Sequence, residues 1–312
     1  MERSAQKECS TWNTTKILLK KSEKMQIPIE KSKKICYTVS IVLAKRQQMD
    51  KKHYGGAILG KIISFANQKG GVGKTTSAVN IAASLGILGF KTLLIDLDPQ
   101  GNATSGVGVA KRSLKLTIKD VLAGDCTAKD AVLETKFQNL SVLPANITLA
   151  GAEFDLFQEE EAPQNVIKNA FAEIKNEYDY LIIDCPPSLG MITLNSLTAS
   201  DGVVIPMQCE FYALEGLSQL MITIGKVKNH YNNSLNVTGI LITMYTNRLL
   251  LTQQVKSELK KHYSGKLFDT HISRGVKLSE APGFGCPVYY HDKRSKGADE
   301  YLAVAHELAT RI

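Results

Sequence analysis

Gln68-Lys69-Gly70-Gly71-Val72-Gly73-Lys74-Thr75-Thr76 stands between an apolar run, residues 62–66, and an amphipathic stretch, residues 75–88. The run predicts a buried β-strand, and the stretch predicts a helix that ends at Gly89. Glycines let the backbone between them curl so that successive N–H groups point toward one centre. The start of the following helix adds the positive end of its dipole. The segment therefore predicts a strand–loop–helix unit that binds phosphate groups.

The side chains of this segment indicate a nucleoside triphosphate bound with a metal ion. Lys74 is placed to reach the β- and γ-phosphates, and the Thr75 hydroxyl can ligate Mg²⁺. The common P-loop pattern G-x-x-x-x-G-K-[ST] needs glycine at position 68, where Gln68 stands, and a second lysine, Lys69, opens the turn instead. We therefore expect a variant P-loop with ATP and Mg²⁺ as cofactors. Its nucleotide-binding residues are Lys69, Gly70, Gly71, Val72, Gly73, Lys74, Thr75 and Thr76.

The rest of the chain repeats the alternation of apolar strands and helices. Further strands are predicted near residues 92–96, 140–143, 180–184, 202–206 and 237–243. Further helices are predicted near residues 163–177, 190–199, 213–231, 252–263 and 297–311. Continuous apolar strands between helices are typical of a parallel sheet covered on both faces. The predicted fold is α/β, a single doubly wound domain with a mostly parallel sheet.

Three aspartates follow two of the predicted strands. Asp184 ends an apolar strand, which is the position where a carboxylate holds Mg²⁺ through water in P-loop proteins. Asp96 ends another strand, and Asp98 lies further out on the same loop. We predict Thr75, Asp96 and Asp184 as the metal site, and Asp98 as the group that orients the attacking water. Lys69, Lys74 and Asp98 are the predicted catalytic residues.

The net charge of +8 is unevenly distributed along the chain. Residues 1–60 hold 13 basic and 5 acidic residues, so they account for all of it. We interpret them as a disordered extension, or as translation assigned upstream of a true start at Met49, with a basic anion-binding arm as the alternative. Residues 61–312 form the predicted domain. Within it, residues 226–277 hold nine basic and two acidic residues, which suggests a local anion-binding face.

Composition excludes several other classes of protein. The chain of 312 residues is 44% hydrophobic and 22% charged, which is ordinary for a globular protein. Its six cysteines are scattered without a CxxC pair, so neither a zinc site nor a disulfide framework is predicted. Apolar runs remain shorter than a membrane span requires, and none near the N-terminus is typical of a secretory signal.

Five segments resemble the ParA/Soj family of chromosome- and plasmid-partitioning ATPases, and the resemblance runs from about Lys61 to Ile312. The first marks the wider deviant-Walker-A group, which includes MinD, and the others narrow it to ParA/Soj-like proteins. The segments are Lys69–Thr76 (KGGVGKTT), Asp96–Asn102 (DLDPQGN), Asp184–Ser188 (DCPPS), Gln208–Gly216 (QCEFYALEG) and Leu278–Pro282 (LSEAP).

The resemblance implies an ATPase that acts as a switch in chromosome or plasmid partitioning. Two subunits would sandwich two ATP molecules, with Lys69 of each reaching the other's phosphates, as an arginine finger does in trans. This homodimer would bind double-stranded DNA without sequence preference, until a ParB/Spo0J-like partner stimulates otherwise slow hydrolysis. Arg248 and Arg274 match positions of DNA-contacting arginines in the family. The resemblance also implies a cytoplasmic, nucleoid-associated protein that does not bind membranes.

Two features of the basic region bear on this interpretation. Lys256, Lys260 and Lys261 share one broad face of a predicted helix and would add to the DNA-binding surface. Ser273 and Gly275 flank Arg274 at positions where family members usually carry proline and asparagine. That loop lies near the nucleotide base in the family, so this departure leaves the adenine contacts open.

Two other functions remain on the same scaffold. A MinD-like division-site regulator would need a basic amphipathic helix appended after the last domain helix, and the chain stops at Ile312. A metabolic ligase or reductase is the other alternative. A reductase like the nitrogenase iron protein would need a cluster-ligating cysteine pair, and Cys185 and Cys209 do not stand in such sequence contexts.

Overall fold

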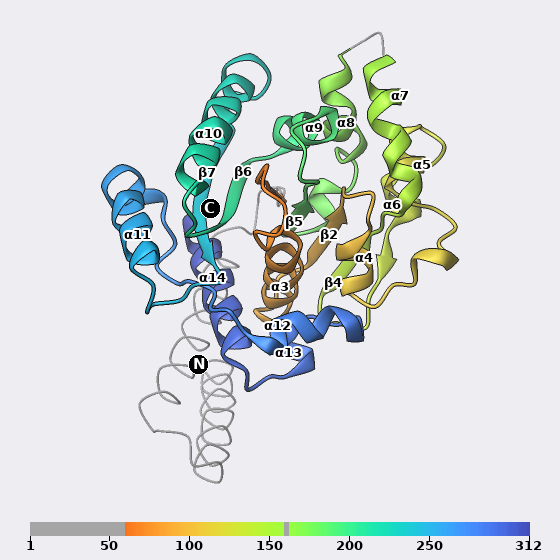
Figure 1. Ribbon diagram of the computed structural model, residues 1–312. Helices are drawn as coiled ribbons and strands as arrows, with labels where there is room; N and C mark the ends of the chain where they lie inside the picture. Colours follow the sequence, from red (N-terminus) through yellow and green to blue (C-terminus); the bar gives the residue numbers. More distant parts are fainter. Residues whose placement is uncertain (1–59, 159–161) are drawn as a thin grey trace, which may run out of the picture. The chain divides into compact units, whose positions relative to one another are not determined.

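The computed structural model describes residues 60–158 and 162–312 (Figure 1). The predicted N-terminal extension and the start at Met49 lie outside these residues. In the described part, seven strands form one sheet in the order β3-β4-β2-β5-β1-β6-β7. The strands are β1 (Lys61–Phe65), β2 (Thr92–Asp96), β3 (Leu133–Glu134), β4 (Leu140–Leu143), β5 (Tyr180–Asp184), β6 (Gly202–Gln208) and β7 (Asn236–Thr243).

The sheet is mostly parallel, as predicted. The six strands β4-β2-β5-β1-β6-β7, in their order across the sheet, are all parallel to their neighbours. The short edge strand β3 pairs with β4 in the antiparallel direction. The sequence analysis did not predict β3, because two exposed residues give no period-2 pattern. All five residues of β2 and of β5 are buried, and the residues before their terminal aspartates are almost all apolar.

Helices cover the sheet on both faces (Figure 1). The longer ones begin and end close to the predicted limits: α3 (Lys74–Ile87), α9 (Met191–Ala199), α10 (Ala213–His230), α11 (Leu250–Tyr263) and α14 (Lys296–Arg311). Strand residues alternate between the faces. Ile62 and Leu181 join the core that includes residues of α9 and α10, whereas α3 packs against the strands and against α14. Tyr301 of α14 is fully buried, and its hydroxyl lies 3.2 Å from the Ser77 hydroxyl of α3.

The single helix predicted near residues 163–177 is wrong. The structure has three short elements there, namely η3 (Pro163–Asn165), α8 (Val166–Ala170) and η4 (Lys175–Glu177). Asn195 of α9 explains the first break, because its side chain accepts from the Ile167 N–H (3.2 Å) and donates to the Pro163 carbonyl (2.7 Å). Tertiary hydrogen bonds thus replace the local ones that a continuous helix would need.

Short helices that the sequence analysis did not place fill the connections. They are α4 (Asn102–Gly106), η1 (Lys111–Ser113), α5 (Ile118–Leu122), α6 (Ala128–Ala131), η2 (Ile147–Gly151), α7 (Ala152–Gln158), η5 (Ser264–Lys266), α12 (Val276–Glu280), η6 (Ala281–Phe284) and α13 (Val288–His291). Most are one or two turns long, which is too short for a clear 3.6-residue period.

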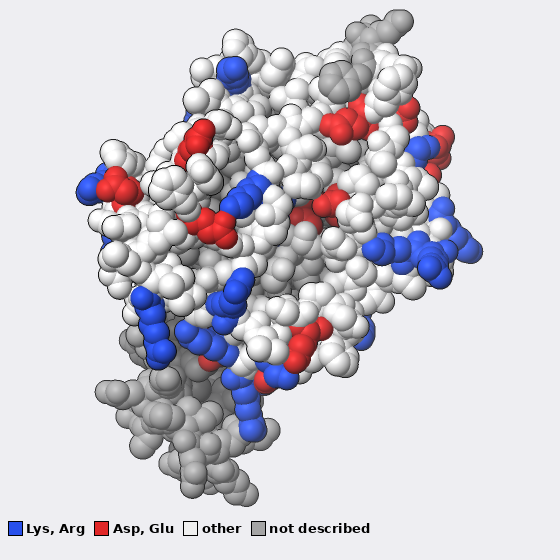
Figure 2. All heavy atoms as spheres, in the orientation of Figure 1, with Lys and Arg blue, Asp and Glu red and all other residues white. Residues whose placement is uncertain are grey.

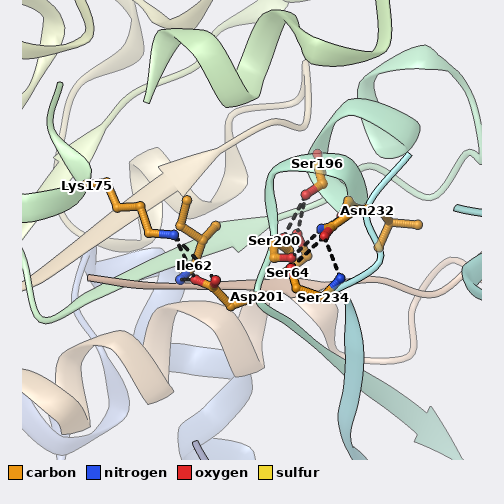
Figure 3. Close-up of polar contacts among 9 residues, drawn as sticks. Ile62, Ser64, Lys175, Ser196, Ser200, Asp201, Asn232 and Ser234 are labelled. Carbon is orange, nitrogen blue, oxygen red and sulfur yellow. Dashed lines mark hydrogen bonds and ion pairs between the residues drawn. The ribbon is translucent and has the colours of Figure 1, made fainter. Parts of the chain in front are cut away.

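A polar cluster lies at the amino ends of the central strands (Figure 3). Asp201, which directly precedes β6, accepts a hydrogen bond from the Ile62 N–H of β1 (2.8 Å). It also forms an ion pair with Lys175 (3.3 Å). The hydroxyls of Ser64 and Ser200 lie 2.6 Å apart beside this pair. We call these five residues the amino-end cluster.

Candidate nucleotide site and basic edge

The loop between β1 and α3 adopts backbone conformations that only glycine adopts easily. Gly71 and Gly73 have φ angles of +75° and +84°, in the left-handed region. Gly73 is also the residue that caps α3, and it provides no side-chain hydrogen bond to the first turn. The first N–H groups of α3 therefore remain available to an anion at this helix start.

Three side-chain hydrogen bonds connect this loop to the neighbouring strands β6 and β7. Asn67 reaches across to the Pro206 carbonyl of β6 (2.7 Å). Gln208, at the end of β6, donates to the Gly71 carbonyl (2.7 Å), and Thr243, at the end of β7, donates to the Val72 carbonyl (2.7 Å). The bonds from Gln208 and Thr243 hold the Gly71 and Val72 carbonyls toward β6 and β7. In the sequence, Gln208 appeared only as part of a family motif, and no pattern pointed to Thr243.

Lys74 is buried and folds back across the loop. Its Nζ donates to the Lys69 carbonyl (3.2 Å). Burial lowers the pKa of Lys74, and the carboxylates of Asp184 and Asp98 partly offset that effect. The ammonium therefore lies inside the loop, desolvated and close to acidic groups. A phosphate there would give it a partner of opposite charge.

Lys69 points away from Lys74. Its ammonium forms an ion pair with Glu210, which lies between β6 and α10. Both side chains are about half exposed, at 48% and 47%. The Lys69 N–H donates to the Asn67 carboxamide (3.0 Å), which fixes the start of the turn. The two lysines of the loop thus have different environments, one buried and one at the surface.

Asp96 and Asp184 lie side by side because their strands are neighbours in register. Asp184 pairs with Asp96 of β2 on one side and with Phe65 of β1 on the other. Both carboxyl groups are fully buried. Burial raises the pKa of both, and the proximity of Asp96 raises that of Asp184 further, well above its usual range.

The two carboxylates differ in their hydrogen bonds. One oxygen of Asp96 accepts from the N–H and the hydroxyl of Thr104 in α4, both at 2.7 Å, and the other accepts from the Asp98 N–H (3.2 Å). Within the described residues, neither oxygen of Asp184 has a hydrogen-bond partner, although the Thr75 side chain lies close enough to lower its pKa. A buried carboxylate without a partner is costly unless a ligand completes it.

The residues present fit a hydrated Mg²⁺ ion. Mg²⁺ keeps several waters and takes one or two carboxylates together with substrate phosphates, rather than an all-protein cage. Asp184 offers unpaired oxygens beside Thr75, whereas Asp96 is committed to Thr104. Residues 60–158 and 162–312 contain no group of three or more His, Cys, Asp or Glu side chains that could hold a metal ion by themselves.

Asp98 lies further out than Asp96 and is only partly buried. Its carboxylate accepts from the Gln100 N–H (2.9 Å), and its carbonyl accepts from the Gly101 N–H (2.8 Å). Lys111 of η1 donates to the Gln100 carbonyl (2.6 Å) and holds the far side of this turn. The bond to Gln100 uses one carboxylate oxygen of Asp98 and leaves the other for a further donor. No pattern in the sequence pointed to Lys111.

The two arginines of the basic block lie on adjacent loops. Arg248 follows β7 and Arg274 precedes α12, and both are exposed. The Tyr245 N–H donates to the Ile272 carbonyl (2.9 Å), and Tyr245 and Ser273 form a parallel bridge that joins the loops. Figure 2 shows Lys and Arg side chains gathered along the edge of the molecule below α11. We call Arg248, Arg274 and their loops the basic edge.

The three lysines of α11, predicted to share one broad face of the helix, have different environments. Lys256 is half-buried, with its ammonium 2.6 Å from His271 Nε2 and 5.2 Å from the centre of the Tyr245 ring. Lys261 forms an ion pair with Glu258 (2.6 Å). Lys260 is exposed. Lys256 therefore supports the Tyr245 loop from inside, and Lys260 is the better candidate for an external anion.

Ser273 holds the Arg274 loop in a way that proline could not. Its N–H and its hydroxyl donate to the two carboxylate oxygens of Glu300 in α14, at 2.8 and 2.7 Å. Lys296 donates to the same hydroxyl (2.6 Å) and pairs with Glu300 (3.3 Å). Proline lacks the N–H for the first bond. The departure at Ser273 thus coincides with a tie between this loop and the last helix.

The described cysteines form no disulfide bonds. Cys126, Cys185, Cys209 and Cys286 are free. Burial raises the pKa of Cys185 to about 12 and that of Cys209 to about 11. Both are therefore protonated thiols at neutral pH in the metal-free chain. Among the described helices, none combines the length and the apolar character that a membrane span needs.

Known proteins resemble the chain over most of its length. A family model described as "AAA domain" matches residues 60–237. The sporulation initiation inhibitor protein Soj of Bacillus subtilis is 50% identical over 251 residues, which cover 80% of this chain and 99% of Soj. The chromosome-partitioning ATPase Soj of Treponema pallidum is 46% identical, covering 81% and 98% of the two chains.

Solved structures with the same fold cover a similar share of the chain. Cobyrinic acid a,c-diamide synthase from Mycobacterium smegmatis, with bound ADP and magnesium, is 36% identical with a TM-score of 0.71, covering 80% of this chain and 94% of that one. The Pyrococcus furiosus cell division ATPase MinD shares the fold, with a TM-score of 0.68 and 24% identity over 80% of this chain and 99% of that one.

Fold and site define a P-loop ATPase of the deviant-Walker-A type, whose cofactors are ATP and Mg²⁺. Within that class, the chain belongs to the ParA/Soj family of partitioning ATPases. The predictions of family, fold class, ATPase activity and cofactors are confirmed.

Proposed function

We propose that this protein is an ATP-dependent switch that binds DNA without sequence preference and acts in partitioning with a ParB/Spo0J-like partner. The observation that carries the proposal is the basic edge. Two exposed arginines lie on loops that are joined to each other, in a chain whose variant P-loop carries an exposed second lysine. Recognition through arginine and phosphate is blind to sequence and sensitive to salt.

The nucleotide end of the switch uses the loop and its two lysines. Lys69, Gly70, Gly71, Val72, Gly73, Lys74, Thr75 and Thr76 cradle the phosphates, with Lys74 between the β- and γ-phosphates. Thr75, Asp96 and Asp184 would hold Mg²⁺, with Asp184 acting through water, and the bound ion would neutralise charge on the phosphates. Asp98 orients the attacking water. This division of roles is consistent with the unpaired oxygens of Asp184 and with the commitment of Asp96 to Thr104.

Dimerisation links the nucleotide to DNA. In the proposed dimer, Lys69 leaves Glu210 and contacts the phosphates bound by the partner subunit. Two basic edges then face the same duplex, and weak contacts add. Because nucleotide and dimer share one equilibrium, hydrolysis stimulated by the partner protein would release the DNA. Residues 61–312 suffice for this cycle, which takes place in the cytoplasm on the nucleoid.

A binding titration on arbitrary duplex DNA tests the proposal. The full chain should bind with ATP and Mg²⁺ and lose most of that affinity with ADP. Arg248→Ala and Arg274→Ala should each weaken binding to all sequences alike and lower the salt slope by about one. Lys260→Ala removes an exposed lysine of α11, and its DNA affinity is compared with that of the two arginine variants. Equal affinity with ATP and ADP would contradict the switch, and a Met49 start that abolishes binding would assign it to residues 1–48.

A further inference from the structure

Three consecutive leucines at the start of α11 are exposed to solvent. Leu249, Leu250 and Leu251 have 56%, 70% and 38% of their surface exposed. The buried face of α11 is formed by Thr252, Val255 and Leu259, so the leucines lie off the side that packs on the core. Single exposed apolar residues are common, but a contiguous group marks a contact surface. We call Leu249–Leu251 the apolar tip.

The apolar tip is continuous with the basic edge. It directly follows Arg248, and the bridge between Tyr245 and Ser273 joins its loop to the loop of Arg274. Val276, two residues beyond Arg274, is a further apolar side chain with 71% of its surface exposed. Apolar and cationic groups therefore occupy the same edge of the molecule.

Local hydrogen bonds fix the loop that carries the tip. The Tyr245 hydroxyl donates to the Asn247 carboxamide oxygen (3.0 Å), and the Gln253 side chain donates to the Asn247 carbonyl (3.2 Å). The Gln253 N–H donates to the Leu249 carbonyl (3.3 Å), the first bond of α11. A tip held in place loses little conformational entropy when it binds.

We propose that the apolar tip enters the minor groove of duplex DNA between the phosphate contacts of Arg248 and Arg274. The inference rests on the DNA binding proposed above and adds its geometry. Charge selects the occupant, because exposed Arg248 directly precedes the tip and exposed Arg274 lies on the loop joined to it. Proteins that combine such charge with a leucine wedge partly unstack a base step and bend the duplex.

The packing of α11 argues against an anionic membrane as the occupant. A helix that lies in a membrane interface presents an apolar face along its length. In α11 that face is formed by Val255 and Leu259, and both are buried in the protein core. Within α11, exposed leucines occur only in the first turn. This arrangement fits insertion of the helix start into a DNA groove better than attachment of the whole helix to a membrane surface.

A double variant, Leu249→Ser with Leu250→Ser, tests the inference in the full chain with ATP and Mg²⁺. Affinity for duplex DNA should fall about tenfold at every salt concentration, because the lost contact is apolar. The salt slope should not change, whereas Arg248→Ala should lower it. Ile222→Ser, which replaces an exposed apolar residue of α10 (61% exposed), is the matched control and should bind as the wild type does.

A second measurement detects the wedge itself. The wild-type protein should prefer a duplex with a two-base mismatch over a matched duplex by several-fold, because unstacking costs less there. It should also raise the fluorescence of 2-aminopurine placed in the base stack of the duplex, because unstacking relieves its quenching, and the double variant should do neither. If the double variant does not fold, Leu250→Ala replaces it, with a smaller loss of the same kind.

The possible outcomes distinguish a failure of the groove insertion from a failure of the proposed DNA binding. Wild-type affinity and fluorescence in the double variant would overturn the wedge while DNA binding stands. Loss of binding to phosphatidylserine vesicles, with DNA binding intact, would assign the tip to a membrane and also overturn it. If the wild type binds no DNA with ATP, the proposed function fails instead.

Discussion

The aspartates at the two ends of the central strands differ in whether their carboxylates have partners. At the amino ends, Asp201 is paired with the Ile62 N–H and with Lys175 (Figure 3). At the carboxyl ends, Asp184 is buried with neither oxygen paired among the described residues. The first arrangement satisfies its polar groups and holds strands together. The second leaves a cost that a bound ligand can remove, which is typical of a functional site rather than a structural one.

This comparison predicts that the two ends separate function from stability. Substitutions at the carboxyl ends should change nucleotide binding and leave or even raise the stability of the free protein. Substitutions at the amino-end cluster should lower stability and leave nucleotide affinity unchanged. Four variants, each with its own control or reference protein, test this separation.

The largest effect is expected from Lys74→Ala. The variant loses the ammonium that lies inside the loop beside Asp184, so ATP affinity measured by calorimetry should fall about 100-fold. Lys175→Ala is the matched control, since it removes a lysine paired with an aspartate at the amino ends. It should bind ATP as the wild type does. Similar losses in both variants would show that the ends are not separate.

Asp201→Ala should act on stability. It leaves the Ile62 N–H without its acceptor and Lys175 without its ion pair, so the free energy of unfolding should fall by about 2 kcal/mol. Urea denaturation without nucleotide measures the change. ATP affinity at a temperature where both proteins are folded should be equal. A loss of affinity as large as that of Lys74→Ala would contradict the comparison.

Asp184→Asn should have the opposite sign. Removing an unpaired buried charge should raise the free energy of unfolding of the nucleotide-free protein by about 1 kcal/mol, measured in the presence of a chelator. Because burial raises the folded-state pKa of Asp184, the folded wild type binds more protons than the unfolded chain above the usual aspartate pKa. The free energy of unfolding of the wild type should therefore fall as the pH rises from the usual aspartate pKa toward the raised folded-state pKa of Asp184.

The carboxamide introduced by Asp184→Asn carries no titrating proton, so the variant should lack this part of the pH dependence. The stability curves of the two proteins should converge as the pH falls toward the unfolded-state pKa of aspartate. Mg²⁺ with ATP should reverse the order, because it stabilises the wild type more than the variant. A variant that is less stable than the wild type under all these conditions would show that Asp184 has a structural partner.

The sequence predicted the regular part of the fold and the centre of the site. Continuous apolar strands and a glycine-rich turn are local patterns, so β5, α3 and the positions of Lys74 and Asp184 followed from them. The broken helix near residues 163–177 did not, because its breaks depend on Asn195 in a helix that comes later in the chain. Partners distant in the sequence leave no periodic signal.

The same limit applies around the site. Thr243 and Lys111 contact the loops only because β7 and η1 fold next to them. Ser273 appeared in the sequence as a departure from a family pattern, and the structure shows two hydrogen bonds to Glu300 at that position. Candidate residues that belong to a local sequence pattern could be predicted from the sequence, whereas contacts with a distant neighbour required the structure.

The smallest effect is expected from Glu210→Gln, at the outer rim of the carboxyl ends. Its ion pair with Lys69 is about half exposed on both sides, and such pairs contribute at most about 1 kcal/mol. The free energy of unfolding should therefore hardly change. In the dimer proposed above, Lys69 would have to leave Glu210 before it reaches the partner's phosphates, so the variant should form that dimer about twofold to fivefold more readily. Light scattering against protein concentration measures this, with Glu215→Gln in α10 as the control. A weaker dimer in Glu210→Gln would mean that Glu210 acts across the interface, not as a restraint within one subunit.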